Sequence, residues 1–381
     1  MSYLKTATFV ILILLVILLL GGIGGVFFDR YAVPRLAAMP RFASMDIFKK
    51  ATEHVTVINK TEQIVIREDD TVERIVSQPA TAVVNILAIP EVTGSGSVVT
   101  TTGVFLTNDG LVATYSETSP LAAGVKYLIL LYDGSSHEAS LLGYDPMVNL
   151  SFFRLKDGTN TPAIALANSD DARVGRRLIA IGNTFGEYQN RLSLGILSNI
   201  NRVFNIAGKS VSSSEKWEGV FEMSLANPED FAGGPVIGYN GEMVGLVGIS
   251  IVDSVSRSFL LPSNVVRDSM NRAIAGKLIT RSTLGVYYLP ITKAYALGQG
   301  LTRDRGALIY SVSGKTGLAI ISDSPAARAG LLAGDIITAV NGKEVNLDSP
   351  LPELLSPFNR GDKIELLIIR GGEERKVPVQ F

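Results

Sequence analysis

The feature that most constrains the fold is a long succession of short apolar runs, each closed by a turn signal. Between Ala82 and Asn264 these runs are VVNILAI, VFLTNDGLVAT, KYLILLYDGSS, HEASLLGYDP, LSFFRL, RRLIAIGN, GVFEMSL, PVIGYNGEMVGLVGI and SFLLPSN. Asn-Asp-Gly at 108–110, Asp-Gly at 133–134 and Asn-Gly at 240–241 favour tight hairpins, because glycine accepts the positive φ that such turns need. Short strands that follow one another without helices between them indicate an antiparallel sandwich or barrel.

The chain divides into four predicted parts. Residues 1–28 are predicted to be a membrane anchor, and residues 29–80 a tether that ends in a short helix, DDTVERIVSQ. Residues 81–280 form the strand-rich domain, whose one clear helix is predicted over 262–277. Residues 281–381 form a further domain with the strands GALIYSV, DIITAV, KIELLIIR and RKVPVQF and two short helical stretches.

The run that starts at Ala7 and ends at Phe28 contains no charged residue. As a helix it would reach roughly 33 Å, which is enough to cross the hydrocarbon core of a bilayer. A cleavable signal peptide is the alternative, but its apolar region is usually about 7–15 residues long, and no A-x-A-like site follows closely. We therefore predict a retained transmembrane helix.

Composition excludes several functional classes. Lys plus Arg number 35 and Asp plus Glu number 36, so the basic excess typical of nucleic-acid binding is absent. The chain has no cysteine, which excludes thiol nucleophiles, disulfide scaffolds and cysteine-ligated zinc. We expect no metal, no cofactor and no nucleic-acid partner.

The region 103–264 resembles the HtrA/DegP family of trypsin-like serine proteases in several segments that follow the family's order. GVFLTNDGLVAT is similar to the segment before the catalytic histidine, and LYDGSSHEASLLGYDPMVNLSFFRL to the strand pair that leads to the catalytic aspartate. RVGRRLIAIGNTFG, LSLGILS, NPEDFAGGPVIGYNGEMVGL and FLLPSN resemble the family's VGD-x-V-x-AIGNPFG, TSGIVS, NPGNSGGPLLNLxGEVIGI and FAIPSN. The resemblance implies a mainly β fold, namely a trypsin-like double β-barrel with the active site between two six-stranded barrels.

The catalytic residues that the resemblance implies have all changed. A serine protease needs a hydroxyl nucleophile, a histidine that takes its proton and a carboxylate that orients the histidine. Here the histidine position holds Glu117, the aspartate position Asn149 and the serine position Ala232. The only two histidines offer no replacement, because His54 precedes the barrels and His137 lies in a hairpin where the family has a surface residue. Glu117 acting as a base on water is a weak alternative, since it would lack an oxyanion hole.

The oxyanion loop differs as well. Where the family has NPGNSGGP, this chain has NPEDFAGGP, which is one residue longer and lacks the first glycine of the loop. Glu229, Asp230 and Phe231 now precede Ala232 and Gly233. We expect the two carboxylates to oppose a developing negative charge at this site.

The C-terminal domain resembles the PDZ domain that follows the protease in this family. SPAARAGLLAGDIITAVNGKEV is close to the family's SPAxxAGLxxGDVIxxVNGxxV. The resemblance implies a β-sandwich with two short helices and a loop whose successive N–H groups hold the C-terminal carboxylate of a peptide. That loop is assigned to Thr283, Leu284, Gly285 and Val286. The alternative is that this segment is only a strand entering the domain. The stretch 313–323 resembles an insertion able to fold over the groove, and Pro357 predicts a short or bent helix beside it.

We interpret the chain as a single-pass membrane protein of a bacterial-type cell membrane, with its bulk on the extracytoplasmic side. Its barrels form a pseudoprotease, and its PDZ domain binds peptide C-termini or unfolded segments and scaffolds or regulates protein quality control in the envelope. One alternative is an active serine endopeptidase of the HtrA/DegP family. Another is a structural subunit whose PDZ groove is closed by its own insertion. Family analogy implies a homo-trimer.

Overall fold

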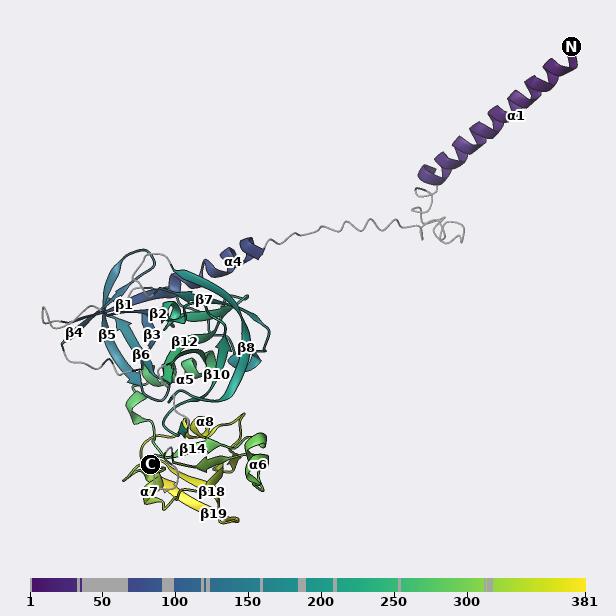
Figure 1. Cartoon of the computed structure of the whole chain (residues 1–381). Helices are drawn as coiled ribbons and strands as arrows, with labels where there is room; N and C mark the ends of the chain where they lie inside the picture. The colour runs from purple at the N-terminus through teal and green to yellow at the C-terminus, as the bar shows by residue number, and fades with distance from the viewer. Residues whose placement is uncertain are drawn as a thin grey trace. The chain divides into compact units, whose positions relative to one another are not determined.

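The computed structural model describes residues 2–32, 35, 68–90, 99–117, 120, 124–157, 160–183, 190–207, 211–252, 255–311, 313 and 318–381 (Figure 1). Two compact units are present, Met1–Ile66 and Arg67–Phe381. Most of the predicted tether 29–80, including His54, lies outside the described residues.

The first unit contains helix α1 (Ser2–Phe27), which continues into a π-helical turn, η1 (Phe28–Ala32). Taken over the residues that the structure describes, no helix is both long and apolar enough to cross a membrane.

The second unit opens with a short helix, α4 (Glu68–Val76), as the sequence predicted, and a 3₁₀ turn, η2 (Pro79–Ala82). Six antiparallel strands then close into a barrel in the order β1-β2-β3-β6-β5-β4. The strands are β1 (Val83–Pro90), β2 (Val99–Phe105), β3 (Leu111–Tyr115), β4 (Val125–Leu130), β5 (Ser136–Asp145) and β6 (Leu150–Leu155).

A second barrel follows in the order β10-β13-β12-β11-β7-β8. Its strands are β7 (Arg177–Gly182), β8 (Arg191–Asn205), β10 (Glu218–Met223), β11 (Pro235–Gly238), β12 (Met243–Val252) and β13 (Val255–Pro262). The short 3₁₀ turns η3 (Ser169–Asp171) and η4 (Pro228–Phe231) lie in its connections, and helix α5 (Ser263–Ile274) and turn η5 (Leu278–Thr280) follow it. The predicted double β-barrel is therefore confirmed.

The turn residues act as the sequence indicated. Gly110, Gly134 and Gly241 have φ values of 81°, 83° and 80°, the left-handed region that tight hairpins need. Because successive strand residues point to opposite faces, the alternating apolar side chains gather inside the barrels. One continuous core cluster includes residues of both, and the rings of Tyr115 and Phe259 meet edge to face with centroids 5.6 Å apart. The two barrels thus pack as one body.

The C-terminal domain is a sheet in the order β19-β18-β16-β15-β14, with β17 paired to β16. Its strands are β14 (Tyr287–Pro290), β15 (Ala307–Ile309), β16 (Ile336–Val340), β17 (Lys343–Glu344), β18 (Lys363–Arg370) and β19 (Glu373–Gln380). Three short helices accompany it among the described residues, α6 (Lys293–Gln299), α7 (Pro325–Arg328) and α8 (Leu351–Leu355), where two were predicted. The unpredicted α6 has ordinary end signals, because Thr292 caps its start and Gly300, at φ 61°, ends it.

One further strand, β9 (Ser212–Ser213), extends this sheet beyond β14. It comes from the connection between β8 and β10 of the second barrel. Its two residues pair antiparallel with Tyr288 and Tyr287 of β14. The described part of the predicted insertion lies elsewhere, because Ile320 bridges Val286 and the N–H of Tyr287 bonds the carbonyl of Ala319. A barrel segment, and not the insertion, thus extends the sheet at β14.

Candidate functional site

Asn149, which the sequence assigns to the position of the catalytic aspartate, is buried in a hydrogen-bond network. It lies in the turn before β6 with φ 55°, a conformation that asparagine tolerates better than most residues. Its Nδ2 donates to Tyr115 Oη at 3.1 Å, and its Oδ1 accepts from Tyr144 Oη at 2.9 Å. Burial raises the pKa of Tyr144 to about 12, so this hydroxyl keeps its proton at neutral pH.

Lys216 is a member of this site that sequence reasoning missed. Its Nζ donates to Asn149 Oδ1 at 2.5 Å and to the carbonyl of Pro146 at 2.6 Å. Burial lowers the pKa of Lys216. The SSSEKWEG stretch that contains it carries no motif, so only the folded chain brings this amine to the triad position.

Glu117, which the sequence assigns to the histidine position, is exposed. Its backbone carbonyl, and not its carboxylate, accepts from Tyr144 Oη at 3.4 Å. The structure therefore places Glu117 near Asn149 without a bond between their side chains among those it describes.

In the loop that would hold an oxyanion, the N–H groups already donate to backbone carbonyls. The chain turns at Asn227, with φ 50°, and then forms the 3₁₀ turn η4. In this turn the N–H of Asp230 donates to the Asn227 carbonyl at 3.0 Å, and that of Ala232 to the Glu229 carbonyl at 3.4 Å. The N–H of Gly233 donates to Val247 at 2.9 Å. N–H groups that already have carbonyl partners cannot be the preorganised donors that an oxyanion requires.

Two of the three residues that precede Ala232 in this loop have structural partners. Phe231 is buried in the apolar core of the second barrel. The carboxylate of Asp230 accepts from Arg191 Nη1 at 3.0 Å. This ion pair with a guanidinium reduces the repulsion that Asp230 was expected to exert on a developing negative charge. Gly233 has φ 79°, and a Cβ there would lie 2.3 Å from the Thr102 carbonyl, so only glycine fits.

His137 lies in a surface hairpin, as predicted, but has two partners. Its Nδ1 bonds Asp157 Oδ2, and its Nε2 lies 3.1 Å from Ser135 Oγ. These are the residue types of a serine-hydrolase triad. However, the Ser135 hydroxyl donates to Asp133 Oδ1 at 2.6 Å in the turn between β4 and β5, so its proton is directed away from the imidazole. We assign this cluster to stabilising the hairpin. Among the described residues no acidic, histidine or cysteine cluster is arranged to hold a metal ion.

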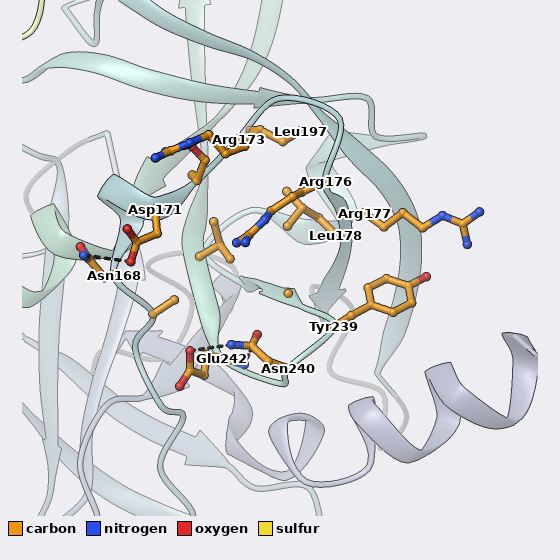
Figure 2. A pocket seen from close by; sticks show the side chains of 14 residues that line it. Asn168, Asp171, Arg173, Arg176, Arg177, Leu178, Leu197, Tyr239, Asn240 and Glu242 are labelled. Carbon is orange, nitrogen blue, oxygen red and sulfur yellow. Dashed lines mark hydrogen bonds between the residues drawn. The ribbon is translucent and has the colours of Figure 1, made fainter. Parts of the chain in front are cut away.

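A cavity of about 730 Å³ in the barrels lies apart from the residues that the sequence assigns to the triad positions. Arg173, Arg176, Arg177, Tyr239 and Glu242 are among the residues that line it (Figure 2). Neither Asn149 nor Ala232 reaches this cavity.

The predicted carboxylate loop of the C-terminal domain combines buried apolar side chains with a glycine of positive φ. Leu284 and Val286 bury their side chains in the domain core, and Thr283 is exposed. Gly285 has φ 83°, and a Cβ there would lie 2.3 Å from Ser324 Cβ. The loop therefore turns successive backbone N–H groups toward the edge of β14, where β9 lies.

Comparisons with known proteins agree with this architecture. Residues 94–246 match the trypsin-like peptidase domain family, and residues 295–381 match the PDZ domain family. Two solved structures titled "HtrA-type protease AlgW with tripeptide" and "HtrA-type protease AlgWS227A with tripeptide" superpose with TM-scores of 0.63 and 0.62 at 25% identity. Each comparison covers 80% of this chain and 95% of the other. In fold and domain order this chain is similar to HtrA-type proteases.

Curated relatives of the HtrA-like chain include probable periplasmic serine endoproteases described as DegP-like. Those of Pseudomonas putida (strain W619) and Ectopseudomonas mendocina (strain ymp) are 29% and 30% identical over 289 residues. The matched region is 75% of this chain and 55% of each relative, so the HtrA-like chain spans about half the length of these relatives.

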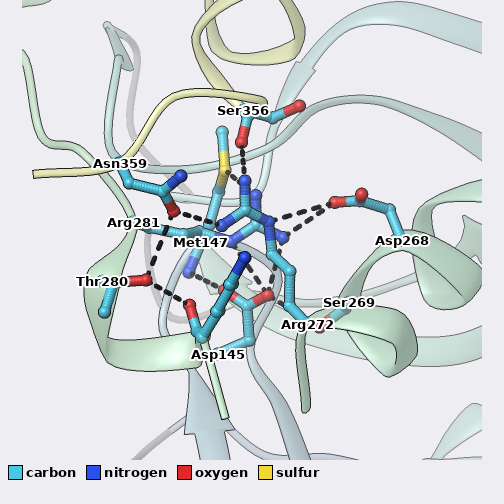
Figure 3. Close-up of polar contacts among 10 residues, drawn as sticks. Asp145, Met147, Asp268, Ser269, Arg272, Thr280, Arg281, Ser356 and Asn359 are labelled. Carbon is cyan, nitrogen blue, oxygen red and sulfur yellow. Dashed lines mark hydrogen bonds and ion pairs between the residues drawn. The ribbon is translucent and has the colours of Figure 1, made fainter. Parts of the chain in front are cut away.

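A buried ion pair joins the barrels of the HtrA-like chain to its PDZ domain (Figure 3). The fully buried Asp145, at the end of β5, accepts from Arg281 Nη2 at 2.8 Å and Nε at 3.1 Å. Ser269 of α5 adds a hydroxyl bond at 2.7 Å. Nearby, Arg272 donates to Asn359 Oδ1 at 3.1 Å and to the carbonyl of Ser356. Barrel and PDZ side chains therefore share one polar network.

Proposed function

We propose that this chain is a membrane-anchored HtrA-like pseudoprotease. The observation that carries the proposal is the combination at Ala232 of a side chain without a heteroatom and a loop in which the N–H groups of Asp230 and Ala232 donate to carbonyls of the same turn. Catalysis would need both a nucleophile and oxyanion donors, and the loss of either removes most of the rate. The neutral, hydrogen-bonded Asn149 also cannot stabilise an imidazolium.

The binding function is assigned to the PDZ domain through Thr283, Leu284, Gly285 and Val286, which recognise peptide C-termini or unfolded segments. Support comes from the PDZ match and from the positive φ of Gly285. In general, loops of this kind hold a C-terminal carboxylate with backbone N–H groups. The titles of the two superposed AlgW structures name a bound tripeptide, which is a statement about those proteins. A protein that binds peptides without cleaving them would scaffold or regulate quality control in the envelope.

The anchor is assigned to the run from Ala7 to Phe28. The proposal rests on the sequence of this run alone, which contains no charged residue. The described residues add no support, since they contain no helix with the length and hydropathy of a membrane span. The bulk is placed on the extracytoplasmic side, since the curated relatives are named periplasmic. A homo-trimer is proposed by family analogy alone.

Proteolysis assays test the proposal directly. The full chain in detergent is incubated with casein and with fluorogenic peptides, and in parallel with a fluorophosphonate that labels activated serines. We expect neither turnover nor labelling above the level of heat-unfolded protein. Turnover that a serine-protease inhibitor abolishes would establish the alternative, an active serine endopeptidase of the kind that the relatives' names describe.

A further inference from the structure

The serine-rich stretch 211–216 of the second barrel lies along the PDZ groove, which we define as β14, the loop Thr283–Val286 and helix α8. Ser212 and Ser213 pair antiparallel with Tyr288 and Tyr287 of β14. An extended peptide that adds a strand to a PDZ domain makes this same kind of pairing. All four residues from Val211 to Ser214 are buried, although three of them are serines.

The side chain of Glu215 bonds the loop that would hold a peptide carboxylate. Its Oε1 accepts from the N–H of Gly285 at 2.7 Å, and the N–H of Leu284 is also directed at this carboxylate. The next N–H, that of Val286, donates to Ser214 Oγ at 3.1 Å, while the Val286 carbonyl accepts from the Ser214 N–H at 3.0 Å. Each of the three consecutive loop N–H groups therefore has a partner from the stretch 211–216.

Glu215 presents the chemical group that ends every peptide. A side-chain carboxylate and a C-terminal carboxylate carry the same charge and the same two acceptor oxygens, so the loop N–H groups suit both equally. Ser214 Oγ also donates to Glu215 Oε1 at 2.8 Å, which holds the carboxylate in place. Burial raises the pKa of Glu215, and the N–H groups of Gly285 and Leu284 act in the opposite direction.

A small cavity beside this contact indicates what a competing peptide would add. It measures about 180 Å³, and Met147, Thr283, Leu355 and Phe358 line it together with Glu215. Leu355 ends α8, the helix that borders the groove. The apolar part of this wall suits the last side chain of a peptide that ends in an aliphatic or aromatic residue, an interaction that Glu215 does not make.

We infer that residues 211–216 are an internal ligand of the PDZ groove, and that a peptide with a free C-terminal carboxylate and an apolar last residue binds by displacing them. The inference rests on the proposed peptide-binding function and adds how access to that groove is regulated. A tethered ligand acts at an effective concentration in the millimolar range, so the intact chain binds peptides more weakly than its groove alone would. Displacement would also withdraw Lys216 from Asn149, because Lys216 directly follows Glu215.

The first test compares peptide affinities of the full chain in detergent by fluorescence anisotropy. The probes are fluorescein-labelled decapeptides of mixed polar sequence that end in Val, Leu or Phe, each made with a free carboxylate and as the C-terminal amide. Glu215→Ala should tighten binding of the carboxylate probes about tenfold, because it removes charge-assisted bonds of the competitor. Glu242→Ala, which removes a carboxylate bonded to Asn240 at the β11–β12 turn, is the matched control and should bind like wild type. No variant should bind the amides.

The second test locks the internal ligand in place. Ser213 and Tyr287 face each other across the β9–β14 pair. The natural chain has no cysteine, so two cysteines introduced here can pair only with each other within one chain. Directly opposed residues of antiparallel strands lie close enough for a disulfide. The variant Ser213→Cys with Tyr287→Cys should lose carboxylate-probe binding when oxidised and regain it when reduced, so one sample is its own folding control.

The outcomes separate the two proposals. Equal affinity of wild type and Glu215→Ala, with undiminished binding by the oxidised lock, would overturn the internal ligand and leave peptide binding intact. Absence of carboxylate-dependent binding in every form, including Glu215→Ala and the reduced double-cysteine variant, would overturn the proposed peptide-binding function and the inference with it.

Discussion

Lys216 changes what a repaired triad would need. An aspartate restored at position 149 would meet the Lys216 amine, which lies 2.5 Å from Asn149 Oδ1, before it met an imidazole at position 117. A carboxylate that is already paired with a lysine orients a histidine poorly. The degenerate site thus contains a competing cation as well as missing groups.

We predict that Ala232→Ser alone restores no proteolysis. The new hydroxyl would find no histidine, and the N–H groups of Asp230 and Ala232 would still donate to their own turn. Oxyanion donors typically contribute about 3–4 kcal/mol each, so turnover should stay at the wild-type background. The measurement is hydrolysis of a fluorogenic peptide, with inhibitor sensitivity as the criterion.

Repair is expected only from a combined variant. It joins Glu117→His, Asn149→Asp and Ala232→Ser to Lys216→Met and to the replacement of residues 229–231 by Gly-Asn. The same variant with Lys216 retained is the control and should be the slower of the two. Inhibitor-sensitive turnover by Ala232→Ser alone would contradict the pseudoprotease assignment.

Arg281 should be among the most sensitive positions of the domain junction. Arg281→Ala leaves the fully buried Asp145 without its guanidinium partner, and breaking a buried pair in this way costs about 3–5 kcal/mol. Arg305→Ala removes an exposed arginine that pairs with Asp304 and Glu344, and should cost much less stability than Arg281→Ala. Urea unfolding followed by tryptophan fluorescence measures both, and a cost for Arg281→Ala no larger than for Arg305→Ala would argue against the buried network.

At the scale of elements, the strands of the barrels could be predicted because their turn signals and apolar runs are local. Gly110, Gly134 and Gly241 all have the positive φ that their sequences indicate. Helix α6 had a capping threonine and a terminal glycine in the sequence, and these signals were overlooked.

The cross-domain strand could not be predicted in the same way. The sequence SVSSSE around β9 has no apolar alternation, and its partner β14 belongs to another domain. The turn η4 was equally hidden, because NPEDFAGGP indicates a changed loop but not which carbonyls its N–H groups bond. The contact between Lys216 and Asn149 likewise depends on tertiary folding, because the two residues are far apart in the sequence.

A side-chain hydrogen bond between β10 and the PDZ domain should make stability depend on pH. Glu218 of β10 is buried and accepts from Tyr288 Oη of β14 at 2.9 Å, with Ser212 and Asn205 as its other polar neighbours. Burial raises the pKa of Glu218 from 4.5 to about 7. The folded chain therefore holds this proton more tightly than the unfolded chain. The associated stability is full below pH 4.5, falls as the pH rises toward about 7 and is lost above it, by at most about 3 kcal/mol.

Thermal unfolding at pH 5 and pH 8 tests this prediction. Glu218→Gln cannot titrate, so its loss of stability between the two pH values should be smaller than that of wild type. The exposed Glu344→Gln is the control and should follow wild type. An unchanged pH difference in Glu218→Gln would show that Glu218 does not hold the additional proton.

At the scale of the whole molecule, we predict that the segment from Ala7 to Phe28 remains in the mature protein. N-terminal sequencing of the chain recovered from the membrane fraction measures this, and alkaline carbonate washing distinguishes an inserted chain from an adsorbed one. A mature chain that begins at or beyond Asp29 would identify the segment as a cleaved signal peptide.

The position of β9 in the chain has a consequence for biosynthesis. The stretch 211–216 leaves the ribosome before its partner residues 284–288 exist, and at about 5–20 residues per second the roughly 70 intervening residues take about 4–14 s. During that interval a nascent barrel displays a strand that fits the PDZ groove of any finished copy nearby. We expect chains translated together on one messenger to exchange these strands, so the yield of correctly paired monomers should fall as ribosomes crowd the messenger and as slower elongation lengthens the interval.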